Sequence, residues 1–93
     1  MTIAPGKLRA LRNDVSIDRV IAALEIPAKR SEGYLRLLCP LCGDFNTATN
    51  PRTNLARCFR CERNFNPIDL VMACDRCSFL DAVDRVERLL RTG

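Results

Sequence analysis

Hydrophobic residues recur at helical spacing near both ends of the chain. Residues 7–12 predict a short basic helix that ends at Asn13 or Asp14. Ser16 is the expected N-cap of a second helix, because the apolar residues after it fall at i, i+3, i+4 and i+7. These residues form one apolar face: Ile17, Val20, Ile21 and Leu24. Pro27 is expected to end this helix.

The middle of the chain predicts short strands joined by turns. Glu32-Gly33 indicates a turn, and strands are expected at Tyr34–Leu38, Thr47–Thr49 and Leu55–Phe59. The second and third of these strands are joined by a turn over residues 50–54, which read Asn-Pro-Arg-Thr-Asn. Together the strands predict a small antiparallel ribbon.

Two further helices are expected after the strands. Asn66 caps the first of them, and Pro67 occupies its first helical position. Its packing surface is Ile68, Leu70, Val71 and Met72. Ser78 and Asp81 form a capping box for the last helix. The expected apolar face of that helix is Leu80, Val83, Val86 and Leu90.

This order of elements predicts one small α+β domain. N-terminal helices are expected within residues 1–28, the ribbon within 29–65 and C-terminal helices within 66–93. A chain of this size buries only about 60% of its unfolded surface, so a bound metal would add stability that the core lacks.

Four cysteines supply the ligands for such a metal. Their spacing is Cys39-x2-Cys42-x15-Cys58-x2-Cys61, and each C-x2-C pair brings two sulfurs onto one tight turn. The fifteen intervening residues suffice for a strand, a turn and a returning strand. Four sulfurs in a tetrahedral cage suit Zn²⁺, so one structural zinc ion per chain is expected. Gly43 after the first pair is free to take a positive φ.

Two disulfides or four inert buried thiols are the alternative to this metal site. The first seven residues lack the apolar run of a signal peptide. No stretch approaches the roughly 20 apolar residues of a membrane span. A cytoplasmic location is therefore expected, where thiols stay reduced and available to metal.

The remaining pair, Cys74 and Cys77, has the same C-x2-C spacing but no further cysteine or histidine to complete a second site. These two residues are expected to be small buried hydrophobic groups, with a redox pair as the alternative. The chain also has no Gly-rich phosphate loop and no carboxylate cluster for two-metal chemistry. An enzyme is therefore not expected.

The excess positive charge lies on the segment that carries the four cysteines. The formal net charge is +4, and residues 29–63 hold seven basic and three acidic groups, whereas the rest of the chain is balanced. Four thiolates and Zn²⁺ would together add −2 and leave the loaded chain at about +2. The sequence therefore predicts a local basic patch rather than a strongly basic protein.

Aromatic and basic residues alternate within this patch. Because side chains alternate between the two faces of a strand, Tyr34 and Arg36 share a face, as do Arg57 and Phe59. Aromatic rings that stack on bases, next to arginines that hold phosphates, are typical of proteins that bind single-stranded nucleic acid. The expected contacts are Tyr34, Arg36, Arg57, Arg60 and Arg63. In the alternative, Phe59 and Phe65 fill the core and the arginines form a solvated rim.

The sequence over roughly residues 16–90 resembles the N-terminal zinc ribbon of bacterial DnaG-type DNA primases. The motifs that carry the resemblance are Cys39-Pro40-Leu41-Cys42, Cys58-Phe59-Arg60-Cys61, Pro67-Ile68-Asp69-Leu70-Val71-Met72 and Phe79-x2-Ala82-Val83. The resemblance implies that the ribbon sheet contacts single-stranded template and helps to choose where a primer begins. In that family a separate polymerase domain performs the synthesis.

Three departures separate this chain from the family pattern. The family usually has His as the second ligand, whereas this chain has Cys42, which adds one negative charge to the site. Residues 45–49 read Phe-Asn-Thr-Ala-Thr instead of Lys-Thr-Pro-Ser-Phe, so the family's start-site preference cannot be carried over. Arg60 and Glu62 replace the glycines that usually flank the last cysteine.

The expected function is zinc-dependent binding of single-stranded nucleic acid, with DNA as the expected form, by a stand-alone primase-like module. By analogy it would assist a separately encoded replication polymerase, primase or helicase, on a plasmid, phage or integrated element. The alternatives are a protein–protein adaptor whose arginines engage an acidic partner, and a truncated or regulatory relative of a primase. The sequence leaves open the preferred nucleic-acid sequence, the partner and the oligomeric state.

Overall fold

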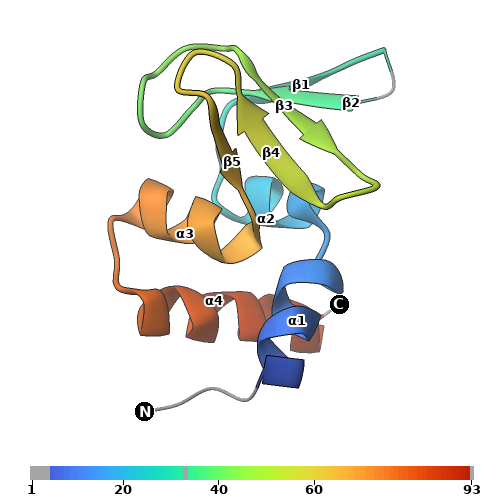
Figure 1. Cartoon of the computed structure of the whole chain (residues 1–93), viewed down its shortest axis with the longest axis vertical. Helices are drawn as coiled ribbons and strands as arrows, with labels where there is room; N and C mark the ends of the chain where they lie inside the picture. Colours follow the sequence, from blue (N-terminus) through green and yellow to red (C-terminus); the bar gives the residue numbers. More distant parts are fainter. Residues whose placement is uncertain (1–4, 33, 93) are drawn as a thin grey trace.

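A five-stranded sheet lies on a layer of helices (Figure 1). The computed structural model describes residues 5–32 and 34–92. The elements in chain order are α1 (Pro5–Asn13), α2 (Ile17–Ala23), β1 (Ala28–Ser31), β2 (Tyr34–Leu37), β3 (Thr47–Asn50), β4 (Leu55–Cys58), β5 (Arg63–Phe65), α3 (Pro67–Asp75) and α4 (Phe79–Thr92). This arrangement confirms the predicted small α+β fold, with helices before and after the ribbon in the chain.

The sheet is an antiparallel meander in the order β1-β2-β3-β4-β5. The three predicted strands are present, but β2 and β4 end one residue early, at Leu37 and Cys58. Two strands were not predicted. β1 is an exposed edge strand that reads Ala-Lys-Arg-Ser, without alternation of apolar and polar residues, and β5 has only three residues.

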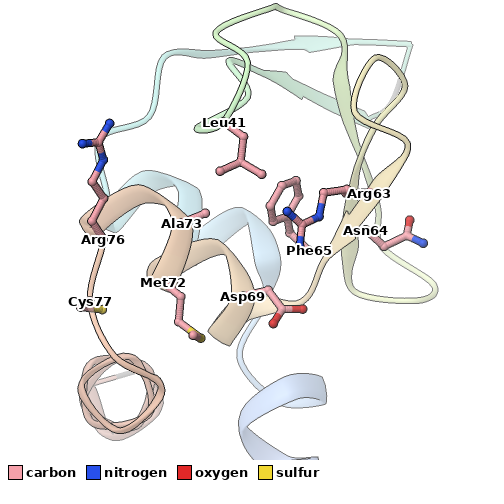
Figure 2. A pocket seen from close by; sticks show the side chains of 9 residues that line it. All are labelled: Leu41, Arg63, Asn64, Phe65, Asp69, Met72, Ala73, Arg76 and Cys77. Carbon is pink, nitrogen blue, oxygen red and sulfur yellow. The ribbon is translucent and has the colours of Figure 1, made fainter.

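Strand alternation gives the sheet an inner face toward the helices and an outer face away from them. Leu37, Ala56 and Phe65 are buried on the inner face. On β5, Arg63 and Phe65 point toward the helix side, where they border a hollow against α3, and Asn64 points away from it (Figure 2). The two faces can therefore bind different groups.

The core lies between the inner face and the helices α2 and α3, and continues between these two helices and α1 and α4, which lie farther from the sheet (Figure 1). Each helix contributes fully or almost fully buried apolar side chains: Leu11 from α1; Ile17, Val20 and Ile21 from α2; Ile68, Leu70 and Val71 from α3; and Ala82, Val83 and Val86 from α4. The sheet is thus supported from one side only, which leaves its outer face open.

The helix starts follow the capping signals in the sequence. Ser16 Oγ accepts a hydrogen bond from the Asp18 amide at 3.2 Å. Asn66 Oδ1 accepts from the Asp69 amide at 2.7 Å, and the Asp69 carboxylate accepts from the Asn66 amide at 3.3 Å. These bonds form a complete capping box. At its other end α2 stops at Ala23, well before Pro27, because Glu25 takes a left-handed φ of 56°.

The last helix begins as predicted, and Val83 and Val86 of its predicted apolar face are buried. Ser78 Oγ accepts from the Asp81 amide at 3.2 Å. Leu80 and Leu90, however, are 46% and 36% exposed, so their assignment to the packing face was wrong. The buried stripe comprises Ala82, Val83 and Val86, and its centre lies roughly a third of a turn away from Leu80, whereas Leu90 lies near the helix end. Within the described ranges, none of the helices has the length and apolar character that crossing a membrane requires.

One asparagine joins the sheet to the N-terminal helices. Asn54 closes the β3–β4 turn with a φ of 56°. Its Nδ2 donates to the carbonyl oxygens of Arg12 and Val15, both at 2.7 Å. Its Oδ1 accepts from the Ile17 amide at 2.8 Å. All hydrogen-bonding groups of this side chain thus hold the α1–α2 connection against the hairpin, a role that the sequence analysis missed.

Candidate metal centre and nucleic-acid interface

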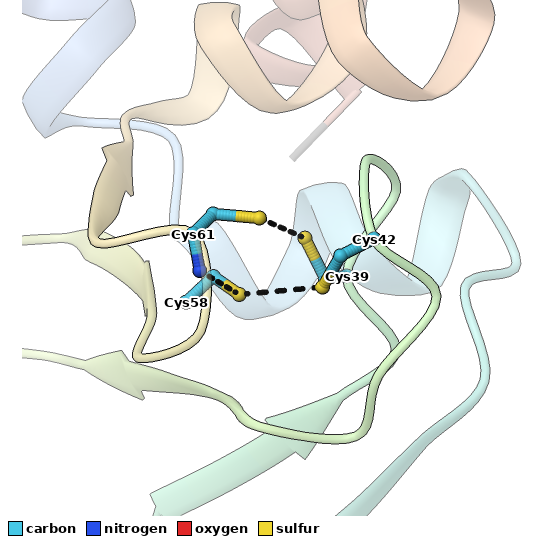
Figure 3. A group of neighbouring side chains, drawn as sticks. All are labelled: Cys39, Cys42, Cys58 and Cys61. Atoms are coloured by element: carbon cyan, nitrogen blue, oxygen red, sulfur yellow. Dashed lines mark hydrogen bonds between the residues drawn. The ribbon is translucent and has the colours of Figure 1, made fainter.

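The four predicted cysteines converge at one end of the sheet (Figure 3). Cys39 and Cys42 lie in a loop after β2, and Cys58 and Cys61 lie at the end of β4 and in the turn that follows. The Sγ–Sγ distance is 3.9 Å between Cys39 and Cys61 and 3.6 Å between Cys42 and Cys58, and all four sulfurs lie within 4.8 Å of one another. None forms a disulfide.

These distances fit a tetrahedral zinc ion. Four sulfurs placed 2.3 Å from one Zn²⁺ would lie about 3.8 Å apart, close to the separations found here. Cys39 and Cys58 are buried, whereas Cys42 and Cys61 are half-buried. With four protein ligands the site has no open position for a water or a substrate. This is the arrangement of a structural zinc site rather than a catalytic one.

Backbone groups of the two cysteine turns support the sulfurs. The Leu41 amide donates to Cys39 Sγ at 3.4 Å, and the Cys61 amide donates to Cys58 Sγ at 3.3 Å. Such N–H···S bonds orient metal-bound thiolates and stabilise their charge. Gly43 follows the first turn with a φ of 75°, as predicted. Glu62 takes a φ of 55° at the same place in the second turn, which costs a non-glycine residue about 1–2 kcal/mol.

The environment of Cys58 favours its thiolate form. Burial raises the pKa of this thiol, but the Cys61 amide and the nearby Thr47 hydroxyl outweigh burial and lower the pKa to about 6. Thr47 lies opposite Cys58 in the β3–β4 register. Its Oγ1 is buried and, apart from the nearby sulfur of Cys58, has no hydrogen-bond partner among the described residues. A metal-bound thiolate at Cys58 would accept from this hydroxyl.

The thiols of Cys42 and Cys61 are harder to ionise in the absence of metal. Burial raises the pKa of Cys61 to about 12, and the thiols of Cys42 and Cys58 act in the same direction. The Asp44 amide lowers the pKa of Cys42, but burial and the thiols of Cys39 and Cys58 outweigh it and raise that pKa overall. Four thiols this close cannot all carry a negative charge without a cation between them.

A second site is a hollow of about 710 Å³ on the outer face of the sheet. Tyr34, Arg36 and Arg57, three of the residues predicted to contact nucleic acid, line it together with Phe59 and Asn64. The side chain of Phe59 is 63% exposed and that of Phe65 only 3% exposed, so the alternative core assignment holds for Phe65 but not for Phe59.

The register explains how the hollow arises. Arg36, Ala48, Arg57 and Asn64 occupy one row across β2, β3, β4 and β5. The small Ala48 side chain leaves space between the two arginines, whose backbones are about 10 Å apart because neighbouring strands are about 4.8 Å apart. The Arg57 guanidinium lies 5.9 Å from the centroid of the Phe59 ring. The guanidinium groups of Arg36 and Arg57 therefore lie in the middle of the hollow. The ring of Tyr34 lies beyond them along the strands on one side, and the ring of Phe59 on the other.

Arg60 and Arg63, which were also predicted to contact nucleic acid, lie elsewhere. Arg60 Nη1 is 2.5 Å from Asp44 Oδ2, in an ion pair between the two cysteine turns. Asp44 raises the pKa of Arg60, and the charges of Cys42 and Cys61 add to this effect. Arg63 lines the inner hollow of about 340 Å³ beside α3 (Figure 2). The structure thus brings three of the five predicted residues into one groove.

Two polar residues of the outer face were not predicted from the sequence. Asn64 lines the groove, and Lys29 of β1 lies directly opposite Arg36 in the same row. Lys29 Nζ is 5.6 Å from the centroid of the Phe45 ring. Both residues belong to the two strands that were not predicted. The sheet face on which each of these side chains lies could have been inferred only once those strands were known.

The spare cysteines remain outside the metal centre. Cys74 and Cys77 are half-buried, and neither joins a cluster of three or more metal-ligating groups in the described part of the chain. Cys77 Sγ is 3.9 Å from the Val71 carbonyl oxygen. Burial raises the pKa of the Cys74 thiol, and Asp75 adds to this effect. The prediction that both are buried was therefore wrong: Cys77 packs partly buried against the core, and Cys74 is half-buried in the last turn of α3.

The comparisons with known proteins agree with this centre. The family model of the CHC2 zinc finger, the zinc ribbon of DnaG, matches residues 3–92. The search of curated proteins gave no match. The matched region contains both cysteine turns and the complete sheet. Because the family is a zinc finger and the four cysteine sulfurs converge on one point, the chain is a zinc-binding ribbon. The chain therefore belongs to the CHC2 zinc-finger family.

Proposed function

We propose that this chain binds single-stranded nucleic acid, with DNA as the expected form, in the groove on the outer face of its sheet. The observation that carries the proposal is the placement of Tyr34, Arg36, Arg57 and Phe59 around one exposed hollow. We further propose that the chain is an accessory of a replication polymerase, primase or helicase, in keeping with its family.

The two groove arginines are available for phosphate. Five other arginines form ion pairs with carboxylates: Arg30 with Asp18, Arg60 with Asp44, Arg85 with Asp75, Arg88 with Asp84 and Arg91 with Glu87. Within the described residues, the Arg36 side chain makes no hydrogen bond or ion pair, and Arg57 donates only to Asn64 Oδ1 at 3.4 Å. A guanidinium without an acidic partner can bind a phosphate group through two parallel hydrogen bonds.

The aromatic residues favour a single strand over a duplex. Phe59 is largely exposed, and Tyr34 is half-buried at the groove wall. In single strands, bases can leave their stack and lie on such rings, whereas a duplex keeps the faces of its bases covered. Amide side chains at the groove, such as Asn64, can donate to or accept from base edges.

The zinc ion would act on this groove indirectly. Cys58 is the last residue of β4 and directly separates Arg57 from Phe59. When bound, the metal supplies a cross-link between the two cysteine turns. The sulfur of Cys58 then fixes the end of the strand that carries Arg57, and so the positions of both groove residues.

We propose a binding module rather than an enzyme. The described groove is lined by arginine, aromatic, amide, threonine hydroxyl and apolar groups, and none of its lining residues carries a carboxylate or thiol that could serve as a general base or nucleophile. The metal centre offers no open coordination position. Both sites are suited to holding a ligand or a fold rather than to transforming a substrate.

Fluorescence anisotropy of the zinc-loaded protein with labelled single-stranded DNA at several salt concentrations tests this proposal. Arg36→Ala and Arg57→Ala should each weaken binding and reduce the slope of log affinity against log salt by about 0.7, the value per phosphate contact of a single strand. Tyr34→Ala should cost roughly 1–3 kcal/mol with little change in slope, because stacking is not electrostatic.

Arg88→Ala is the matched control. Arg88 is an exposed arginine of α4, paired with Asp84 and outside the groove, so its loss should leave binding unchanged. Wild-type binding by correctly folded, zinc-loaded Arg36→Ala and Arg57→Ala variants would contradict the proposed groove. No measurable binding by the parent protein at physiological salt would instead support a protein adaptor.

A further inference from the structure

The closest contact between charged side chains at the metal centre joins the two cysteine turns. Arg60 lies between the second pair of cysteines, and Asp44 follows the first pair. Arg60 Nη1 and Asp44 Oδ2 are 2.5 Å apart. We infer that Arg60 is a positioning residue of the zinc site, which holds the two turns together across the four sulfurs and slows the release of the ion.

Asp44 is well placed to serve as the fixed end of this link. Its carbonyl oxygen accepts a hydrogen bond from the Cys39 amide at 2.9 Å, and the Gly43 amide donates to the Cys39 carbonyl oxygen at 2.9 Å. The carboxylate that meets Arg60 is therefore attached to a closed turn. The Phe59 amide donates to the Asn46 carbonyl oxygen at 3.2 Å, which adds a second connection between the same two segments.

The charge of the centre gives the link a further role. Four thiolates around Zn²⁺ carry a net charge of −2, and Asp44 adds another negative charge at the edge. Arg60 places one positive charge beside this group, on the same turn as Cys58 and Cys61. Because charge-assisted hydrogen bonds are about twice as strong as neutral ones, this pair opposes separation of the turns more than an amide contact would.

Release of the metal requires the turns to separate. Each turn contributes two of the four sulfurs, so an ion that leaves must lose the ligands of one turn while the other still holds it. A contact that keeps the turns closed lowers the rate of this first step. The ion pair of Arg60 also distinguishes it from Arg36 and Arg57, which have no acidic partner among the described residues.

The test is the rate at which zinc leaves the loaded, full-length chain for an excess of the chromogenic chelator 4-(2-pyridylazo)resorcinol at low ionic strength. Arg60→Ala and Asp44→Asn should each accelerate release by about threefold to fivefold, the upper part of the range expected for a partly exposed ion pair. The double variant should be no faster than the faster single variant, because both substitutions break the same contact. Arg60→Lys should restore part of the slow release.

Salt and a charge reversal separate this role from simple packing. The acceleration by Arg60→Ala should shrink in 1 M salt, where exposed charges are screened over about 3 Å. The variant Arg60→Asp combined with Asp44→Arg should release zinc more slowly than Arg60→Asp alone. Arg63→Ala is the control, because this arginine lies close to Cys61 in the chain but borders the inner hollow instead of the pair.

Wild-type release from zinc-loaded Arg60→Ala, or fully additive effects of Arg60→Ala and Asp44→Asn, would overturn the inference. A loss of about 0.7 in the salt slope of DNA binding by Arg60→Ala, with unchanged zinc release, would also overturn it and make Arg60 a phosphate contact. The release assay contains no nucleic acid, so its result stands whether or not the proposed groove binds DNA.

Discussion

Chelation of zinc should unfold the β-sheet of this protein. Structural zinc in small domains contributes on the order of 10–16 kcal/mol of apparent binding free energy, as much as or more than the whole stability of such a domain. Here the cysteine turns hold the ends of β2 and β4, and the sheet is covered by helices on one face only. Loss of the sheet signal in far-UV circular dichroism, with recovery when zinc is restored, is the expected result.

Single cysteine variants assign the effect to the four-sulfur centre. Cys58→Ser removes a buried ligand and should abolish stoichiometric zinc in native mass spectrometry. Cys74→Ser, a half-buried cysteine outside the cluster, should retain one zinc ion per chain. A second zinc equivalent that disappears with Cys74→Ser, or a sheet that survives complete chelation, would contradict the single structural site.

Replacement of Asn54 should destabilise the protein strongly, although this residue neither binds metal nor belongs to the apolar core. Asn54→Ala removes three hydrogen bonds and leaves the Ile17 amide and the carbonyl oxygens of Arg12 and Val15 without their partner. It also places alanine at a φ of 56°. Unsatisfied buried groups cost about 1–3 kcal/mol each, so a loss of about 2–4 kcal/mol is expected where water replaces part of the contact. Urea unfolding of the zinc-loaded protein measures it.

Related substitutions separate the contribution of backbone strain to the loss of stability from that of the side-chain hydrogen bonds. Asn54→Gly keeps the left-handed backbone at no steric cost but loses all three bonds, so it should recover only the strain component. Thr53→Ala changes an exposed residue of the same turn and serves as the control. An Asn54→Ala variant as stable as Thr53→Ala would show that the hairpin does not depend on this side chain.

Local signals in the sequence predicted the elements that depend on local interactions. Ser16 and Asn66 cap helices because their side chains bond to amides two or three residues away, which any folded context preserves. The cysteine spacing predicted the metal centre for a similar reason. Each of the two tight turns positions two sulfurs locally, and these four sulfurs are all the ligands that a tetrahedral zinc ion requires.

Features that depend on distant segments could not be predicted in this way. The polar edge strand β1 owes its pairing to β2, not to its own composition. Arg63 faces the helices because it pairs with Cys58 on the inner face, and a shift of one residue in register would have put it in the outer groove. Asn54 forms hydrogen bonds to segments about forty residues away in the chain. The sequence of its own turn therefore gave no sign that its side chain connects the hairpin to the N-terminal helices.

The placement of single-stranded DNA on the outer sheet face is tested most directly by NMR. A short deoxythymidine oligonucleotide is titrated into the ¹⁵N-labelled, zinc-loaded protein, and the amide and arginine side-chain signals are followed. Shifts should concentrate in β2, β3 and β4 and at the Nε of Arg36 and Arg57, while the amides of α4 stay unchanged. Shifts confined to α4 or to the inner hollow beside α3, or no shifts at physiological salt, would contradict the proposed interface.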